Sequence, residues 1–337
     1  MRHLITAALL SLAFTATGAS AQSDPPSYRN LAPIALPDGR WDLLSVDTAH
    51  HRVLIGRSDS LDIVDLDKGV VKSVGTVSRG HAAVAIEGTN LVAITSGGDN
   101  SVRLIDATSG EQTASIAVGQ NPDAAFYDAA SKRLIVMNAT GGTVSIVDPA
   151  TASVARTVTV KPALELGTLI APDMLAINDE DAGEIELVDL TQGLALPPIV
   201  LTGCEGPTGI AFDQADGLLL SACANGQAAL VDARAHRLIE LLPIGRGADG
   251  ALFDPQRRRF MVPCGQTGTL VVFGVDADRH VTALDTVPTE LGARTATLDP
   301  VSGRIYLPAA TFAAPPSAGG RPTQVAGSAH LIVLEPS

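Results

Sequence analysis

The chain has 337 residues and a formal net charge of −13, with 36 acidic residues against 23 lysines and arginines. Nucleic-acid binding depends on Lys and Arg releasing the counterions of the phosphates, so this charge argues against nucleic acid as a partner. Aromatic residues make up only 3% of the chain, which counts against a carbohydrate-binding face, because sugar rings commonly stack on aromatic side chains. Short β-branched runs between turn residues, with 32 Gly and 21 Pro, predict an all-β fold.

Residues 1–21 have the features of an export signal. Arg2 supplies a positive charge, Leu4 to Phe14 form an apolar stretch, and Ala19-Ser20-Ala21 form a small-residue cleavage site. The apolar stretch is shorter than the ~20 residues that a membrane-spanning helix needs. We therefore expect cleavage after Ala21, a mature chain of residues 22–337 with no membrane span, and a periplasmic location in a Gram-negative bacterium.

An apolar run that ends in aspartate recurs along the chain at nearly constant spacing. The copies end at Asp65, Asp106, Asp148, Asp189, Asp232 and Asp276, and a weaker copy ends at Glu335. The first five intervals are 41, 42, 41, 43 and 44 residues, the length of a four-stranded propeller blade. The repeat predicts a seven-bladed β-propeller with blades starting near residues 41, 80, 122, 165, 207, 248 and 293.

The last repeat ends after its third strand, near Leu331 to Leu334. Residues 28–36 resemble the fourth strand of the other repeats, so we expect them to complete the last blade and to close the ring without an exposed edge. The Pro- and Gly-rich stretch 311–328 is expected to be a long surface loop between the second and third strands of that blade. Aspartates at the turns, such as Asp128, Asp254 and Asp299, are expected to accept backbone N–H groups.

Polar residues recur where the first strand of each blade begins, at the end of the channel where propellers mainly bind ligands. In five blades a polar residue lies five positions before the aspartate that ends the first strand, and alignment of the second repeat with these blades adds a sixth. The six residues are Asp42, His81, Asp123, Thr208, Asp249 and Arg294. The fourth blade, near Gly167, offers no polar side chain by this count. The six residues are the predicted ligand-binding ring at the channel mouth.

Three interpretations of this ring stay open. Carboxylates with a hydroxyl and water suit a hard cation such as calcium, and a site that includes His81 suits a transition metal. The candidate metal ligands are Asp42, His81, Asp123 and Asp249. A lactonase or lyase would use His81 as a general base near a polarising Arg294. The ring residues can also pair with one another and simply hold adjacent blades together.

A second acidic cluster lies at the expected turn between the middle strands of the fourth repeat and consists of Asp179, Glu180, Asp181, Glu184 and Glu186. Its spacing differs from that of the twelve-residue calcium loop, and a solvated hairpin is expected. Asn178 and Glu180 are the residues of this segment that could reach the channel mouth.

Three cysteines in an exported chain suggest one disulfide and one remaining thiol. Cys204 lies in the loop before the fifth blade and Cys223 ends the second strand of that blade, 19 residues later. A Cys204–Cys223 disulfide is predicted, which would stabilise the fold by roughly 3 kcal/mol in the chain-entropy model. Cys264 is expected to be a small residue at the edge of the core. A three-thiolate metal site is the alternative, although no Cys-x-x-Cys pair supports it.

Several short segments at equivalent places in the repeats resemble one known family. They are Asn121-Pro122-Asp123-Ala124-Ala125, Asn178-Asp179-Glu180-Asp181, Cys204-Glu205-Gly206-Pro207-Thr208-Gly209, Gly268-Thr269-Leu270 and Gly292-Ala293-Arg294-Thr295. In these segments and across its mature length the chain resembles the YVTN-repeat, YncE-like seven-bladed propellers of bacterial cell envelopes. The resemblance implies a periplasmic propeller and carries over no catalytic residue.

The sequence therefore favours a binding or scaffold module that presents a polar channel mouth to a small ligand or to an envelope protein, and a monomer. The alternative is a metal-assisted or acid/base lactonase or lyase that acts at the same mouth. No Gly-rich phosphate loop, Gly-x-Ser-x-Gly elbow or His-Glu-x-x-His motif supports an enzyme, and a divalent cation is the one cofactor considered.

Overall fold

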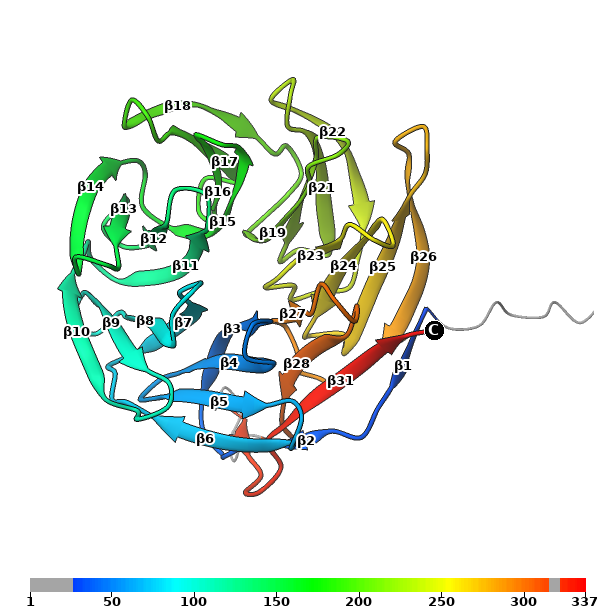
Figure 1. Ribbon diagram of the computed structural model, residues 1–337. Coiled ribbons are helices and arrows are strands. Elements are labelled where there is room, and N and C mark those ends of the chain that lie inside the picture. The colour runs from blue at the N-terminus through cyan, green and yellow to red at the C-terminus, as the bar shows by residue number, and fades with distance from the viewer. Residues whose placement is uncertain (1–26, 315–321) are drawn as a thin grey trace, which may run out of the picture.

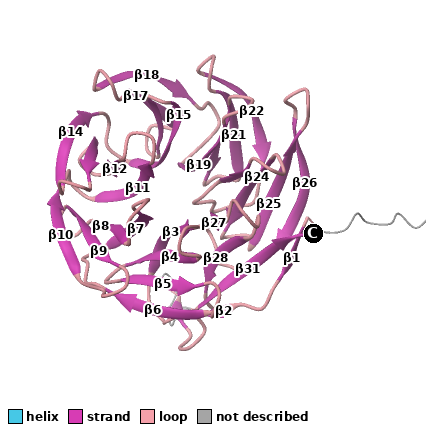
Figure 2. Cartoon of the chain, in the orientation of Figure 1, coloured by secondary structure: helices cyan, strands magenta, loops and turns pink. Residues whose placement is uncertain are grey.

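The computed structural model describes residues 27–314 and 322–337. The expected signal peptide, residues 1–21, lies outside the described residues, and so do residues 315–321 of the expected long loop. Within the described residues the chain consists of strands, turns and loops, without a helix (Figure 2). The predicted all-β class is confirmed.

The described residues form seven antiparallel sheets around a central axis, so the predicted seven-bladed propeller is confirmed (Figure 1). The first three blades contain β3 (Trp41–Asp47), β4 (Arg52–Arg57), β5 (Leu61–Asp65), β6 (Val70–Val74), β7 (Gly80–Ala85), β8 (Leu91–Ser96), β9 (Ser101–Asp106), β10 (Gln112–Ala117), β11 (Pro122–Asp128), β12 (Arg133–Asn138), β13 (Thr143–Asp148) and β14 (Ser153–Thr159). The next three contain β15 (Leu164–Ala171), β16 (Met174–Asp179), β17 (Glu184–Asp189), β18 (Leu194–Val200), β19 (Pro207–Asp213), β20 (Leu218–Cys223), β21 (Gln227–Asp232), β22 (Arg237–Pro243), β23 (Leu252–Asp254), β24 (Arg259–Cys264), β25 (Thr269–Val275) and β26 (Val281–Pro288).

The seventh blade joins the two ends of the described chain. Its strands β27 (Thr297–Leu298), β28 (Ile305–Ala309) and β31 (His330–Pro336) come from the C-terminal part, and β1 (Tyr28–Asn30) and β2 (Ile34–Ala35) complete it from the N-terminal part. Both N-terminal strands pair antiparallel with β31, with Tyr28 opposite Pro336 and Ile34 opposite Leu331. The predicted closure by residues 28–36 is confirmed, and it leaves the outer edge of β31 paired.

Burial explains the sequence of the middle strands. Every residue of β4 and β20 is buried, because the faces of a blade are covered by its two neighbours, and strands buried on both faces read as continuous apolar runs. The described residues form seven apolar clusters, one at each interface between blades. At one of them, Leu220 of the fifth blade packs in the same cluster as Phe260 and Phe273 of the sixth.

The loop between β28 and β31 carries a small hairpin of β29 (Phe312–Ala313) and β30 (Thr323–Gln324). Asp38, which lies just before the first blade, accepts a hydrogen bond from the backbone N–H of Gly327 at 2.6 Å. The described parts of the expected 311–328 loop are thus attached to the N-terminal segment.

The turn aspartates have the role expected of them. Asp254 accepts backbone N–H groups from Gln256 and Arg257 at 2.9 and 3.0 Å. The aspartates that end the third strands do the same for the turns that follow, as Asp232 does for Arg234 and Ala235 at 3.0 and 2.9 Å. The repeated aspartate is therefore a turn former.

Candidate binding site at the channel mouth

The first strands of the blades begin with a shift in strand register, and the residues of the candidate site lie at this shift. In the third blade Pro122 pairs with Asn138 and Ala125 with Val136, so one extra residue is inserted between these pairs. Register shifts occur at the same place in β3, β7, β15 and β19. A β-bulge re-aims the side chains beside it, and the residue directly after the opening pair is the ring residue in each case. Across the seven blades these residues are Asp42, His81, Asp123, Glu165, Thr208, Asp249 and Arg294.

The structure corrects the sequence analysis at the fourth blade. That blade does contribute a polar side chain, Glu165, and not the neighbourhood of Gly167. The earlier count failed because β15 has no aspartate at its end from which to count. The structure identifies Glu165 because it directly follows Leu164, a buried residue that opens the strand as Pro122 does in the third blade.

His81 stands between two carboxylates. Its Nδ1 lies 2.6 Å from Asp42 Oδ2 and 3.6 Å from Asp123 Oδ1, so the first three blades meet at this side chain. Burial alone would lower the pKa of His81, but the hydrogen bond with Asp42 and the negative charge of Asp123 outweigh it and raise that pKa. His81 is therefore held in a position that favours its protonated form.

The other ring nitrogen of His81, Nε2, is buried and has no hydrogen-bond partner among the residues that the structure describes. Gly97 lies against it, since a Cβ atom placed on Gly97 would come within 3.2 Å of Nε2 and 2.6 Å of Asn121 Oδ1. A substrate could reach this nitrogen only if these groups moved, and this weakens the case for His81 as a general base.

Arg294 closes the ring on the opposite side of Asp42. Its Nε lies 2.7 Å from Asp249 Oδ2, and its guanidinium is 3.8 Å from Asp42 Oδ1. Burial raises the pKa of Asp249 to about 7, although the charge of Arg294 lowers it and the charges of the other carboxylates add to the rise. The Arg294 side chain is 53% exposed, so it covers the mouth from the solvent side.

The carboxylates of the mouth outnumber the cations that face them. Burial, together with the charges of the neighbouring carboxylates, raises the pKa of Asp123 to about 6 and that of Glu165 to about 9. Glu180, which is exposed, adds to this repulsion. The cations that act on these groups are Arg79, Arg294 and His81. Five carboxyl groups thus face two guanidinium groups and one imidazole, and the carboxyl groups repel one another when they are ionised.

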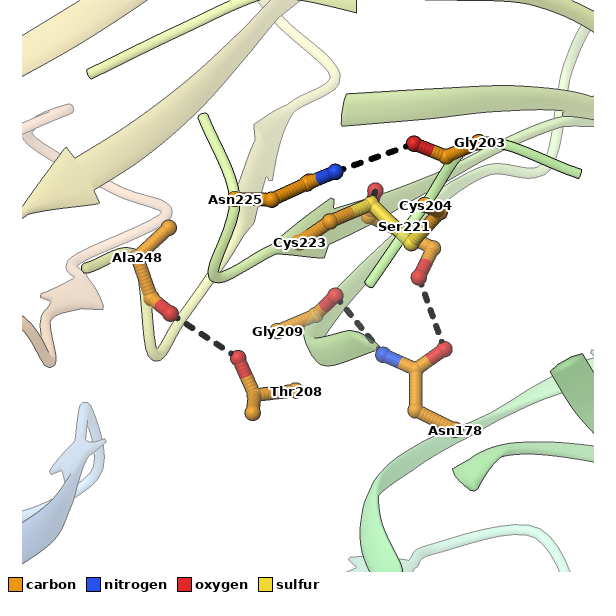
Figure 3. Close-up of a disulfide and its surroundings, with 9 residues drawn as sticks. All are labelled: Asn178, Gly203, Cys204, Thr208, Gly209, Ser221, Cys223, Asn225 and Ala248. Atoms are coloured by element: carbon orange, nitrogen blue, oxygen red, sulfur yellow. Dashed lines mark hydrogen bonds between the residues drawn. A yellow bond between two sulfur atoms is a disulfide. The ribbon is translucent and has the colours of Figure 1, made fainter. Parts of the chain in front are cut away.

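Thr208 occupies the ring position of the fifth blade but is used within the structure. It is 6% exposed, and its hydroxyl donates a hydrogen bond to the Ala248 carbonyl at 3.0 Å (Figure 3). This contact joins the fifth and sixth blades. The hydroxyl of Thr208 is therefore engaged between blades, unlike the carboxylates of the ring.

Below the mouth, the channel is lined mainly by apolar side chains. A cavity of about 190 Å³ lies among the first strands and reaches Asp249 at the ring. Its apolar lining includes Leu43, Ala82, Ala124, Phe126, Leu166 and Leu252. The site therefore combines a charged rim with an apolar shaft.

Asp42, His81 and Asp123 are the residues of the mouth that could hold a metal ion, because their ligand atoms lie within 4.8 Å of one another. One imidazole and two carboxylates suit a transition metal better than calcium. Asp249, the fourth candidate ligand, lies outside this trio, and its carboxylate pairs with Arg294.

The second acidic cluster differs from its expected solvated form. Asp179, Glu184 and Glu186 are 1, 7 and 3% exposed, respectively. Lys161 contacts Glu184 and lies 3.2 Å from Glu186, so a cation of the protein already occupies the cluster.

Asn178 does not reach the mouth, because both ends of its amide are used between the fourth and fifth blades. It donates to the Gly209 carbonyl at 2.9 Å and accepts from the Ser221 hydroxyl at 2.8 Å (Figure 3). Glu180 is the residue of this segment whose charge acts on the mouth.

The predicted Cys204–Cys223 disulfide is present, with Cα atoms 5.5 Å apart, and it fastens the loop before β19 to the end of β20 (Figure 3). Cys264 is a free, buried cysteine. Burial raises the pKa of Cys264 to about 11, which leaves its thiol protonated and unreactive at neutral pH. The core-edge role expected of Cys264 agrees with this position, and the pairing of Cys204 with Cys223 removes two of the three thiolates that a metal site would need.

No known family model matches the chain, and no curated protein matches its sequence. Solved structures do match its fold. A chain of the mitotic checkpoint complex is 13% identical with a TM-score of 0.72, and the match covers 98% of this chain and 99% of that one. The RRP9 WD40 repeats are 11% identical with a TM-score of 0.74, covering 93% and 99%. Hydrazine synthase of Kuenenia stuttgartiensis is 13% identical with a TM-score of 0.66, covering 87% and 96%.

At these identities the comparisons show the fold alone. In residues 27–314 and 322–337, no helix has the length and apolar character of a membrane span. The chain is a seven-bladed β-propeller of WD40-like architecture.

Proposed function

We propose that this protein is an exported propeller of the YVTN-repeat type that acts as a binding module, and that its channel mouth binds a positively charged group. The observation that carries the proposal is the ring itself: Asp42, Asp123, Glu165 and Asp249 converge at one end of the channel. His81 and Arg294 pair with Asp42 and Asp249, and the four carboxyl groups still repel one another, as their effects on the pKa of Glu165 show.

A bound cation would reduce the repulsion among the mouth carboxylates, which lowers the stability of the folded protein. Carboxylates that repel one another and are partly buried keep their protons to a higher pH, as the pKa values of Asp249 and Glu165 do. A cation at the mouth would interact most strongly with the ionised forms, so its binding would release protons. Charged groups set in a low-dielectric mouth also attract oppositely charged ligands from a distance.

Export is supported by the leader-like residues 1–21 and by the disulfide, because disulfides persist mainly in oxidising compartments. A periplasmic monomer that serves a small ligand or an envelope protein agrees with both features. The family resemblance of the repeat segments supports the same location.

An acid/base lactonase or lyase is the second candidate. The His81–Asp42 pair favours it, because a carboxylate that holds the Nδ1 of histidine is a common way to orient a base. The unreachable Nε2 beside Gly97 counts against it. A binding role requires neither this nitrogen nor an assembled catalytic set.

The test is a titration of the carboxyl carbons by ¹³C NMR at pH 8 with methylammonium, acetate or ethanol as matched small probes. We expect methylammonium to release protons and to shift the signals of Glu165 and Asp249, whereas acetate and ethanol leave them unchanged. The variant Asp249→Asn should weaken the response, and Asp232→Asn, at an outer turn, should not. Equal responses to all three probes would contradict a cation site.

Elemental analysis of protein purified from the periplasm tests the metal alternative. If the protein contains a stoichiometric divalent metal that is lost in Asp123→Ala, a metal site and an enzymatic function would be favoured over the binding of an organic cation.

A further inference from the structure

We infer that the mouth and the shaft together form a site for an aliphatic primary amine, with its ammonium group among the ring carboxylates and its hydrocarbon chain in the channel. The inference rests on the proposed function, because it names the class of cation that the mouth would bind. Two observations support it: Asp249 belongs both to the ring and to the lining of the cavity, and most of the other lining residues are apolar.

The continuity of rim and cavity is seen at Asp249. This residue belongs to the ring, where it pairs with Arg294 at 2.7 Å, and it also lines the cavity together with Gly250 and Ala251. A ligand whose charge lies beside Asp249 can therefore extend directly into the shaft. The two parts of the site would then be filled by two ends of one molecule.

The rim selects the head of the ligand. An ammonium group has three N–H donors and no acceptor, and carboxylates from several blades converge on the mouth. A carboxylate or phosphate ligand would meet like charges there. A quaternary ammonium group has no N–H to donate and is usually bound by several aromatic faces, whereas the lining of this cavity contains one aromatic residue, Phe126.

The shaft selects the remainder of the ligand. Side chains from most of the first strands line it, among them Leu43, Ala124 and Leu166, and its volume is about 190 Å³. This volume equals that of roughly six water molecules at about 30 Å³ each. A polyol would lose its hydrogen bonds to water in such a place without replacing them. A short linear alkyl chain can be buried at a gain for each methylene group.

The test is a calorimetric series at pH 8 with methyl-, propyl-, butyl-, hexyl- and octylammonium, with hexanol and hexanoate as controls. Affinity is expected to rise roughly fourfold with each methylene that enters the shaft and to level off when the shaft is full. Hexanol and hexanoate should bind at least tenfold more weakly than hexylammonium.

Two variants separate the rim from the shaft. Leu166→Phe reduces the volume of the cavity, so it should abolish the increase of affinity with chain length, and urea denaturation shows whether the variant is folded. Asp249→Asn should weaken every amine by a similar factor, and Asp232→Asn, at an outer turn, should weaken none.

The outcomes distinguish the two levels of the proposal. If all amines bind with equal affinity, the mouth is a cation site but the shaft is not used, and the inference is overturned. If none of them binds, the proposed function fails with it. If Nα-acetyl-lysine methylamide binds while butylammonium does not, the ligand is a side chain of a protein partner and the free amine is excluded.

Discussion

Aspartates occur in two settings in this propeller, at the outer turns that follow the third strands and at the channel mouth. At the turns, backbone N–H groups surround the carboxylate: those of Ala235 and Arg234 lower the pKa of Asp232. At the mouth, burial and other carboxylates raise the pKa of Asp123 and Asp249. The same side chain is thus stabilised as an anion in one place and destabilised in the other.

The difference shows which aspartates the fold explains. Each turn aspartate satisfies backbone donors that would otherwise lack a partner, so its presence in six of the seven repeats follows from the architecture. The mouth carboxylates reduce the stability of the folded state when they ionise. Perturbed carboxylates that are grouped in this way mark a functional site more often than a structural one.

The largest expected effect is on the pH dependence of stability. The pKa values of Asp123, Asp249 and Glu165 in the folded state, about 6, 7 and 9, lie above their ordinary values, so the folded state binds more protons than the unfolded state. Stability from these groups is complete below about pH 4 and is lost as the pH rises through 6 to 9. His81, whose pKa is also raised, acts in the same direction.

We expect the unfolding free energy to fall by several kcal/mol between pH 5 and pH 9, because one pKa unit corresponds to about 1.4 kcal/mol for each group and the repulsion that the groups share counts only once. Urea denaturation at pH 5, 7 and 9 measures it. The triple variant Asp123→Asn/Glu165→Gln/Asp249→Asn is the control, and a slope that persists in this variant would assign the effect to groups outside the mouth.

The disulfide should have the next largest effect, because it lies on the mouth face and helps to hold the like charges together. The double variant Cys204→Ser/Cys223→Ser is expected to lose roughly 3 kcal/mol of unfolding free energy, since the bridge closes a loop with a sequence separation of 19 residues. Chemical denaturation of both proteins measures the loss. Cys264→Ala, which removes a buried thiol that is not cross-linked, should lower the unfolding free energy by about 1 kcal/mol. An equal loss in Cys264→Ala and in the double variant would argue against a specific role of the disulfide.

Much of the fold could be predicted from the sequence because its determinants are local and repeated. The spacing of strand-end aspartates such as Asp106 and Asp148 gave the blade length, and the incomplete last repeat indicated the closure by residues 28–36. The Cys204–Cys223 pairing followed from the alignment of the blades. These features depend on contacts within one repeat or between equivalent positions.

The candidate site was only partly accessible to sequence reasoning, because it depends on bulges and on contacts between distant blades. Glu165 was missed since the fourth repeat lacks the aspartate used for counting, and Thr208 was included although its hydroxyl bonds to the neighbouring blade. The burial of Glu186 against Lys161 depends on the packing of a side chain from the preceding connection. Such packing leaves no periodic signal in the sequence.

Glu165→Gln tests the mouth at a single residue. Because burial and like charges raise the pKa of Glu165 to about 9, the folded protein must keep this group protonated at pH 8. An amide at this position removes that cost, so we expect the unfolding free energy at pH 8 to increase by about 2 kcal/mol, with no gain at pH 4. Glu180→Gln, at an exposed position, should change it by less than about 0.5 kcal/mol. A destabilised Glu165→Gln would mean that this carboxylate has a structural partner.

Asp232→Ala tests the other half of the comparison and should have the smallest effect, of opposite sign. The substitution removes the acceptor for two backbone N–H groups, so the unfolding free energy at pH 7 should fall by about 1 kcal/mol. The pKa of Asp232 is lowered in the folded state, so its contribution is present above the ordinary pKa and is lost as the pH falls through the lowered one. Asp232→Asn keeps an acceptor oxygen and should lose less. If Asp232→Ala were instead stabilising at pH 8, as Glu165→Gln is expected to be, turn and mouth carboxylates would be equivalent, and the case for a binding site at the mouth would lose its physical basis.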